Sequence, residues 1–267
     1  MIVDLDRVAA AIAEIAETEI ASRFGRLKDE HIDTKTGPND FVTEADHAAE
    51  AALEKALKGI YPGAGFIGEE SVAADPSLVH ALEGDGVFWI VDPLDGTRNF
   101  VEGHSEYGSI VALVENGETR AGWIQAIPDH AAAIASKGDG ATWRGDKLSP
   151  LAAKEGALVG HRAIGNLAEP WKGTIVPRLR AGFETEAVRC SAYGYINMAR
   201  GRRDFALYSR CSPWDHAAGV LILEEICGKA EYLDDGAPYA PRMTQGRPML
   251  AAGNTVNWAR VRDELAA

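Results

Sequence analysis

Two acidic residues, Asp92 and Asp95, stand three positions apart in the chain, and Gly96 and Thr97 follow at once. The apolar run 88–91 before them predicts a buried strand, which we expect to break at the proline between the two aspartates. Ligands collect where the strands of open α/β sheets end, and oxygen-only side chains suit a hard cation such as Mg²⁺. The stretch therefore predicts a metal and phosphate site. A plain strand followed by an Asp-Gly turn is the alternative.

Three further acidic clusters occur along the chain, at Glu69-Glu70, at Thr43 to Asp46 and at Asp215. The glutamate pair follows a short predicted strand, and the other two clusters open predicted helices. Each also has a structural interpretation. Thr43 and Asp46 fit a capping box, the glutamates fit a solvated loop, and Asp215 fits a favourable charge at a helix start. All four clusters together favour one shared site.

These clusters belong to longer motifs. Gly68-Glu69-Glu70, the stretch Asp92 to Phe100 and the stretch Trp214 to Gly219 occur in this order, with Val42 to Asp46 upstream. In these motifs the chain resembles the inositol monophosphatase family of Mg²⁺-dependent, lithium-sensitive phosphatases, from near Lys35 to the last strand. The resemblance implies a phosphoric monoester hydrolase that acts on a small phosphorylated metabolite. It also implies a homodimer and an α+β fold, the layered α-β-α-β-α sandwich.

The resemblance also implies two or three Mg²⁺ ions, held by acidic side chains and one carbonyl group. The implied ligands are Glu69, Asp92, Asp95, Asp215 and the backbone carbonyl of Leu94. Paired divalent ions activate a water molecule and neutralise charge on the phosphoryl oxygens. Asp46 and Glu70 would lie behind these ligands or hold a weaker third ion.

Catalysis would depend on Glu69 and Thr97, which by resemblance orient the attacking water. The implied substrate contacts are Asp95, Gly96 and Thr97, with phosphate bound by the N–H groups of Gly96 and Thr97 at a helix start. Tyr208 stands seven residues before Asp215, where inositol-specific members carry a glutamate that binds sugar hydroxyls. We therefore expect Tyr208 to face the leaving group, with one hydroxyl in place of a carboxylate.

The substrate stays open among several classes. An inositol monophosphatase-like activity on inositol 1-phosphate is the leading interpretation. Arg98 stands where inositol enzymes commonly have threonine, and in this it is similar to members that act on histidinol phosphate. Histidinol-phosphate phosphatase and 3′(2′),5′-bisphosphate nucleotidase are therefore alternatives. A non-catalytic relative that binds a phosphorylated metabolite or regulates a partner is the alternative from another class.

The composition of the chain restricts the classes of partner and the cellular compartment that we expect. The net charge of −13 argues against binding to nucleic acid, because an acidic surface repels the phosphate backbone. No apolar run is long enough for a membrane span, and three cysteines without CxxC spacing indicate neither a disulfide framework nor a zinc site. We expect a cytoplasmic protein. The basic cluster Arg200 to Arg203 is interpreted as a solvated turn, with contact to the far end of a substrate as the alternative, and His216 is expected on a helix surface.

Hydrophobic spacing predicts the elements that must position these residues. In the first half we expect helices over about 4–25 and 44–58, the second closed by Gly59, and strands at 66–68, 88–91, 107–114, 119–127, 132–136 and 141–143. Asn116-Gly117 indicates a hairpin. After residue 150, short strands alternate with helices at 157–160, 173–180, 192–200, 205–208, 215–226 and 249–252. This pattern predicts two parts: an N-terminal α+β part over 1–150 that carries most metal ligands, and a C-terminal α/β part over 151–267 that carries Asp215.

Overall fold

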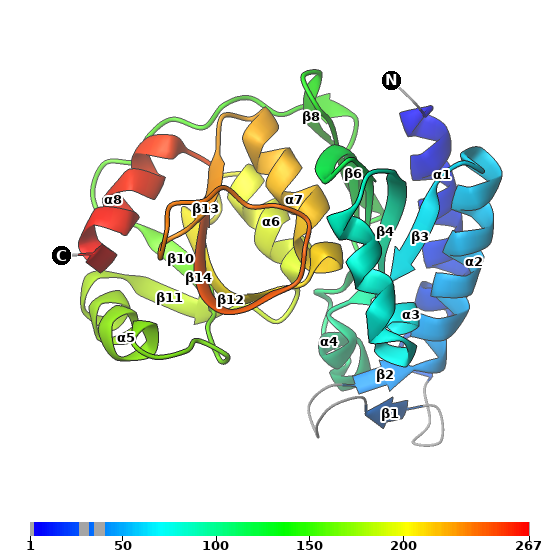
Figure 1. Cartoon of the computed structure of the whole chain (residues 1–267), viewed down its shortest axis with the longest axis horizontal. Coiled ribbons are helices and arrows are strands. Elements are labelled where there is room, and N and C mark those ends of the chain that lie inside the picture. Colours follow the sequence, from blue (N-terminus) through cyan, green and yellow to red (C-terminus); the bar gives the residue numbers. More distant parts are fainter. Residues whose placement is uncertain (1–2, 27–31, 35–40, 267) are drawn as a thin grey trace.

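The computed structural model describes residues 3–26, 32–34 and 41–266, so the expected start of the resemblance near Lys35 lies outside the described residues. Its elements stack as helix, sheet, helix, sheet and helix (Figure 1), which is the expected α+β layered sandwich. In the described residues, no helix combines the length and the apolar character that crossing a membrane requires.

A seven-stranded sheet carries most of the predicted site. In spatial order its strands are β3 (Gly65–Gly68), β4 (Val87–Asp95), β5 (Gly108–Glu115), β6 (Glu118–Ala126), β7 (Ala131–Ser136), β8 (Gly140–Trp143) and β9 (Asp146–Lys147). Only β3 and β4 run parallel, and the remaining pairs are antiparallel. The β5–β6 turn is the predicted hairpin, with φ of 52° at Asn116 and 75° at Gly117, the left-handed values that this two-residue turn requires.

The expected break of the first strand at Pro93 is wrong. β4 continues through the proline to Asp95, and its pairing with β5 shifts register between Asp92 and Asp95. Proline cannot donate a ladder hydrogen bond, so an irregularity is needed there. The shift lets the strand continue while it brings both aspartates to the same end of the sheet.

Two helices cover the outer face of this sheet, α1 (Leu5–Ile15) and α2 (Glu44–Ile60). The first does not run as one α-helix to residue 25. It passes into a π-helical segment, Ala16–Ile20, and a 3₁₀ turn, Ala21–Arg23. Gly59 does not close α2 as expected, because the helix continues to Ile60 and Tyr61 follows as its C-cap. Ile60 and Tyr61 pack against the core that contains Leu57 and Trp89, which favours the longer helix over a glycine stop.

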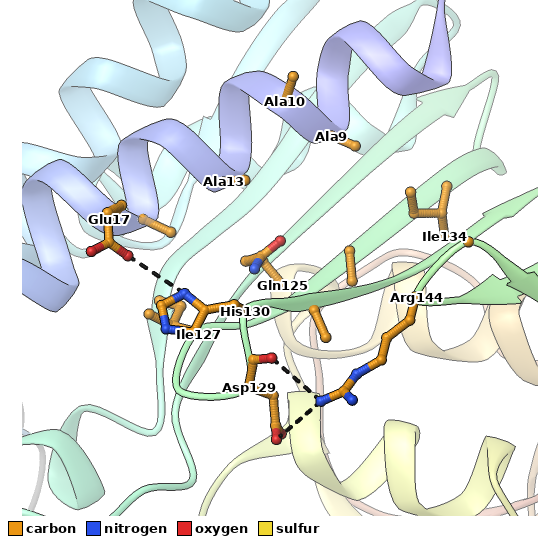
Figure 2. Close-up of a pocket in the computed structure, with 14 residues that line it drawn as sticks. Ala9, Ala10, Ala13, Glu17, Gln125, Ile127, Asp129, His130, Ile134 and Arg144 are labelled. Carbon is orange, nitrogen blue, oxygen red and sulfur yellow. Dashed lines mark hydrogen bonds and ion pairs between the residues drawn. The ribbon is translucent and has the colours of Figure 1, made fainter.

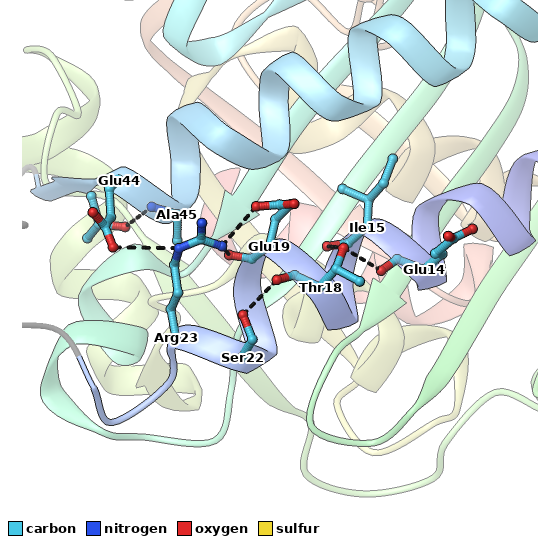
Figure 3. Close-up of polar contacts among 9 residues, drawn as sticks. Glu14, Ile15, Thr18, Glu19, Ser22, Arg23, Glu44 and Ala45 are labelled. Atoms are coloured by element: carbon cyan, nitrogen blue, oxygen red, sulfur yellow. Dashed lines mark hydrogen bonds and ion pairs between the residues drawn. The ribbon is translucent and has the colours of Figure 1, made fainter.

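Arg23 joins the end of the first helical segment to the start of α2 (Figure 3). Its guanidinium lies 2.9 Å from the Glu19 carboxylate and 3.6 Å from that of Glu44. Within the segment, the hydroxyls of Thr18 and Ser22 donate to backbone carbonyls four residues earlier, at 3.0 Å and 2.6 Å. The Arg23–Glu44 contact therefore links this segment to the first turn of α2, which contains Asp46.

A five-stranded sheet forms the second half. Its order is β11 (Glu184–Ala187), β10 (Val159–Ala163), β12 (Phe205–Cys211), β14 (Thr244–Ala252) and β13 (Lys229–Tyr232), and β11 and β13 fall outside the expected segments. Helices α5 (Trp171–Gly182) and α8 (Thr255–Ala266) cover its outer face. The larger sheet ends at Lys147 and this one begins at Val159. The division into parts at residue 150 stays a prediction, because helices between the sheets contact both.

Those inner helices are α6 (Ser191–Ala199) and α7 (Pro213–Glu225). α7 contacts β5, β6 and β7 of the larger sheet and β13 of the smaller one. Gly122 on β6 allows this approach, since a Cβ there would come within 2.7 Å of the Ala218 backbone. Residues 213–223 are almost all buried, so α7 is apolar on every side. This central helix carries Asp215 in its first turn.

Candidate active site

Three carboxylates from three different elements meet at the end of β4. Glu69 is the first residue of α3 (Glu69–Ala74), Asp92 lies in β4, and Asp215 lies in the first turn of α7. Each offers one oxygen, and the three oxygens all lie within 4.8 Å of one another. One oxygen of Asp92, Oδ1, is buried and has no hydrogen-bond partner among the described residues.

Burial and mutual repulsion raise the pKa values of Asp92 and Asp215. The pKa of Asp92 stands well above its usual range because the side chain is buried and faces the charges of Glu69, Asp95 and Asp215. Burial, with repulsion from Glu69, raises the pKa of Asp215 to about 7. A crowded, dry set of oxygen ligands with an unpartnered oxygen fits a hard divalent cation, which would neutralise the cluster.

Asp95 lines the same pocket, but protein donors already hold one of its oxygens. Its Oδ2 accepts the Ala192 N–H at 2.6 Å and lies 2.9 Å from the Cys190 thiol. These donors lower the pKa of Asp95, while burial acts in the opposite direction more strongly and leaves it raised to about 6. Asp95 therefore ties β4 to the start of α6. Its second oxygen is the one that could bind a metal.

Gly96 and Thr97 follow Asp95 and begin the short helix α4 (Thr97–Glu102). Gly96 has φ of 84°, and a Cβ there would lie 2.9 Å from the Glu106 carbonyl, so the turn requires glycine. The Thr97 hydroxyl lies 2.8 Å from the Leu94 carbonyl and 3.1 Å from Asp46 Oδ1. Asp95, Gly96, Thr97 and Leu94 all line one pocket with the acidic cluster.

Asp46 serves two structures at once. Its Oδ2 accepts the Thr43 N–H at 2.8 Å in a capping box at the start of α2, which directly follows the short strand β2 (Phe41–Thr43). Its other oxygen faces Thr97. The two interpretations weighed for this cluster, a helix cap and a place behind the site, are therefore compatible, and Asp46 fixes the Thr97 hydroxyl from α2.

Glu50, one turn further along α2, is a site residue that the motifs do not reveal. Its carboxylate accepts the N–H groups of Glu70 and Ser71, both at 2.8 Å, and so holds the start of α3 where Glu69 lies. A Cβ at Gly68 would come within 2.3 Å of this carboxylate, so the glycine makes room for it. The i, i+4 spacing from Asp46 is the signal that could have identified Glu50. Glu70 itself is buried beside this contact.

Tyr208 does not reach the pocket. It is 1 % exposed, stacks on Tyr195 with ring centroids 5.8 Å apart, and meets the His216 ring edge-on at 4.7 Å. Its hydroxyl is buried without a partner in the described part of the chain. This placement does not fit the expected contact with a leaving group. The seven-residue spacing to Asp215 does not account for the register shift that follows Tyr208 in β12.

His216 is buried, so its expected place on a helix surface is wrong. Because α7 lies between two sheets, it has no solvent face at this position. Nε2 lies 3.1 Å from the Arg210 carbonyl and therefore donates to it, while Nδ1 accepts from the Tyr195 hydroxyl at 2.8 Å. Burial lowers the pKa of His216 to about 4, which keeps the ring neutral. His216 fixes the backbone of β12.

Three arginines line the pocket beside the acidic cluster, and motif matching identified only the first, Arg98. Arg98 and Arg189 both contact the Glu102 carboxylate, at 2.8 Å and 3.2 Å. Arg210 is the one exposed residue of β12. The pocket has a volume of about 280 Å³. The cluster Arg200 to Arg203 does not line it: these residues follow α6 in a turn, where Arg200 covers Trp143 and Arg203 pairs with Glu186.

A larger pocket, of about 620 Å³, lies between α1 and the strands β6 and β7 (Figure 2). Much of its wall is alanine, and ion pairs at its edge join Glu17 to His130 and Asp129 to Arg144. None of the expected site residues lines it. Size alone therefore does not mark the site, whereas the convergence of carboxylates does.

Comparison with known proteins agrees with this geometry. The model of the inositol monophosphatase family matches residues 2–265, nearly the whole chain. This chain belongs to the inositol monophosphatase family. The family is one of phosphatases, and the motifs that carry the acidic cluster are the ones that the resemblance rested on.

Relatives within the inositol monophosphatase family carry different activities in their names. The chain is 32 % identical to an inositol-1-monophosphatase of Bacillus subtilis over 216 residues, which cover 78 % of each chain. It is 33 % identical to a histidinol-phosphatase of Mycobacterium tuberculosis over 234 residues, covering 85 % of this chain and 86 % of the relative. A solved inositol monophosphatase/NADP phosphatase, complexed with Mg²⁺ and phosphate, has the same fold with a TM-score of 0.76 at 20 % identity, covering 96 % and 94 % of the two chains.

Proposed function

We propose that this chain is a Mg²⁺-dependent phosphomonoesterase that releases inorganic phosphate from a small phosphorylated metabolite. The observation that carries the proposal is the convergence of Glu69, Asp92 and Asp215, with one Asp92 oxygen buried and unpartnered among the described residues. Membership of the inositol monophosphatase family supports the same reaction class.

The metal ligands would be Glu69, Asp92, Asp95, Asp215 and the Leu94 carbonyl, all of which line one pocket. Bound divalent ions supply charge neutralisation at the phosphoryl oxygens and a more acidic water. Glu69 and Thr97 would orient that water, because the Thr97 hydroxyl is held by Asp46 and by the Leu94 carbonyl. Gly96 would let the backbone approach the phosphate, with Asp95 and Thr97 beside it. Asp46, Glu50 and Glu70 would keep these groups in place.

The substrate is proposed at the level of a class. Inositol 1-phosphate is the leading candidate, and histidinol phosphate and 3′(2′),5′-bisphosphate nucleotides are the alternatives. Lithium inhibition, a homodimer and a cytoplasmic location stay predictions that rest on the resemblance.

Phosphate release tests the proposal directly. We expect release from at least one member of a panel of inositol phosphates, histidinol phosphate, sugar phosphates and 3′-phosphoadenosine 5′-phosphate, with Mg²⁺ and not with a chelator. Binding without turnover across the whole panel would support the non-catalytic alternative instead.

A further inference from the structure

Arg210 is an exposed cation without a close ion-pair partner among the described residues, and it lies at the edge of an anionic pocket. It lies in β12, where every other residue from Phe205 to Cys211 is buried, and its side chain is exposed at the pocket that Asp215 also lines. Within the described ranges, no carboxylate lies within ion-pair distance of its guanidinium, although the protein carries a net charge of −13 and Asp215 attracts it from further away. An arginine that is left unpaired at a pocket is available to an anionic ligand.

The fold holds Arg210 in this place. The pairing of β12 with β14 shifts register between Tyr208, opposite Met249, and Arg210, opposite Gln245. Such irregularities redirect side chains and recur beside active sites. The Arg210 carbonyl also accepts from the buried His216, 3.1 Å away, and His216 is held in turn by Tyr195. The guanidinium therefore extends from a backbone that α6 and α7 both fix.

The pocket has two chemically different walls. Glu69, Asp92 and Asp95, from α3 and β4, form the acidic wall where metal and the transferred phosphate would bind. The other wall comes from the C-terminal sheet, the chain before α6 and the first residues of α6 and α7. Its lining consists of Ala163, Val188, Arg189, Cys190, Ser191, Arg210, Trp214 and Asp215, and among these described residues the one carboxylate is Asp215, which belongs to the metal cluster.

We infer that Arg210 binds a second anionic group on the part of the substrate that leaves after hydrolysis. The inference rests on the proposed function and narrows its substrate class. A neutral polyol would find two guanidinium groups on this wall, and the one carboxylate there, Asp215, belongs to the metal cluster and is not available to accept its hydroxyl protons. A cationic leaving group, such as the amine of histidinol, would be repelled by Arg210. A phosphate or a carboxylate at this position is matched in charge.

The test compares substrates that differ only in the second charge. In the phosphate arm, fructose 1,6-bisphosphate is compared with fructose 1-phosphate. In the carboxylate arm, 3-phosphoglycerate is compared with glycerol 3-phosphate. For each pair the ratio of kcat/KM, charged over neutral, is measured with Mg²⁺ for the wild type, Arg210→Gln and Arg210→Lys. Arg202→Gln is the matched control, because Arg202 is exposed in the turn at the opposite end of β12.

We expect the wild type to favour the charged member in one arm, and that arm identifies the anion as phosphate or carboxylate. Arg210→Gln should lower this ratio roughly tenfold or more, mainly through KM, because a charge-assisted hydrogen bond is lost. Arg210→Lys should restore part of it, and Arg202→Gln should leave it unchanged. Equal losses for both members would place Arg210 on the transferred phosphate and overturn the inference, as would an unchanged ratio.

Product binding separates this inference from the proposed function. Calorimetry with fructose 6-phosphate against fructose, and with glycerate against glycerol, needs no turnover. Tighter binding of an anionic product, lost in Arg210→Gln, would support the anion contact even if no phosphate is released, an outcome that would contradict the phosphatase proposal alone. Equal binding of charged and neutral products would contradict the anion contact.

Discussion

Asp92 is the side chain of the site on which we expect metal binding to depend most. It is 2 % exposed, its Oδ1 has no partner among the described residues, and three other carboxylates repel it. Asp92→Asn should therefore lower Mg²⁺-dependent phosphate release by roughly a hundredfold or more, since even partners behind a metal ligand cost 10–100-fold when lost. Folding should survive, because the change removes repulsion.

Turnover at saturating Mg²⁺, measured beside a thermal melt, checks this expectation. Asp85→Asn is the matched control, since Asp85 is exposed before β4 begins. Near-normal turnover of the Asp92 variant would remove it from the metal site.

Thr97 offers a hydroxyl whose position two neighbours fix, the Leu94 carbonyl and Asp46. If that hydroxyl orients the attacking water, Thr97→Ala should lower kcat by about 10²-fold and change KM much less. Thr97→Ser keeps the hydroxyl and should retain most of the rate. Steady-state kinetics of the two variants decide the matter, and an unchanged kcat in the alanine variant would leave Thr97 a purely structural role.

We expect Tyr208 to have no direct role in substrate recognition. Its buried hydroxyl has no partner in the described residues, so Tyr208→Phe should keep KM within about twofold and keep or raise stability by up to about 1 kcal/mol. Tyr208→Glu would place a carboxylate in the core and should destabilise the fold by several kcal/mol. Urea unfolding and KM for inositol 1-phosphate are the measurements. A tenfold rise in KM for the phenylalanine variant would bring Tyr208 back to the pocket.

At the scale of elements, the short helix α3 depends on α2. The Glu50 carboxylate accepts the N–H groups of Glu70 and Ser71, the two residues that follow Glu69. Glu50→Gln should therefore weaken the hydrogen bonds that position Glu69. We expect the Mg²⁺ concentration for half-maximal activity to rise roughly tenfold, with kcat at saturating Mg²⁺ changed much less. Glu54→Gln, on the same helix but exposed in an ion pair with Lys58, is the control. Equal Mg²⁺ curves for both variants would contradict this role of Glu50.

What the sequence predicts well is what its neighbours along the chain encode. The capping box at Thr43, the hairpin at Asn116-Gly117 and the acidic motifs each depend on a few adjacent residues. The partners of Asp95 and of the first N–H groups of α3 come from far along the chain. No local pattern pairs Asp95 with Cys190 or Ala192, and the spacing that points to Glu50 does not reveal what Glu50 binds. The prediction for His216 is wrong for a related reason: a helix between two sheets has no solvent face, so helical periodicity carries no information about exposure.

At the scale of the whole molecule, the site joins both halves of the chain. Asp92 belongs to the larger sheet and Asp215 to α7, while Asp95 accepts a hydrogen bond from α6. An ion bound between them would stabilise only the folded state, by about 2.7 kcal/mol at a hundred times the dissociation constant. Saturating Mg²⁺ should therefore raise Tm by roughly 5 °C or more in a chain of this size.

Differential scanning calorimetry with Mg²⁺, and with NaCl at the same ionic strength, measures this shift. Asp92→Asn should show a much smaller response to Mg²⁺. A Tm that does not depend on Mg²⁺ in the wild type would indicate that no ion joins the two halves.

The position of α7 has a consequence for how the protein is made. The ribosome completes the last strand of the larger sheet at Lys147, but α7, the inner helix that covers most of this face, begins only at Pro213. Until that segment emerges, the apolar residues of β5 and β6 that α7 covers have no permanent neighbour. A nascent chain paused between these points would expose a broad hydrophobic surface. Intermediates with such surfaces are prone to aggregate and are bound by chaperones. The segment that carries Asp215 to the site is thus also the segment whose synthesis ends the exposure of this hydrophobic surface.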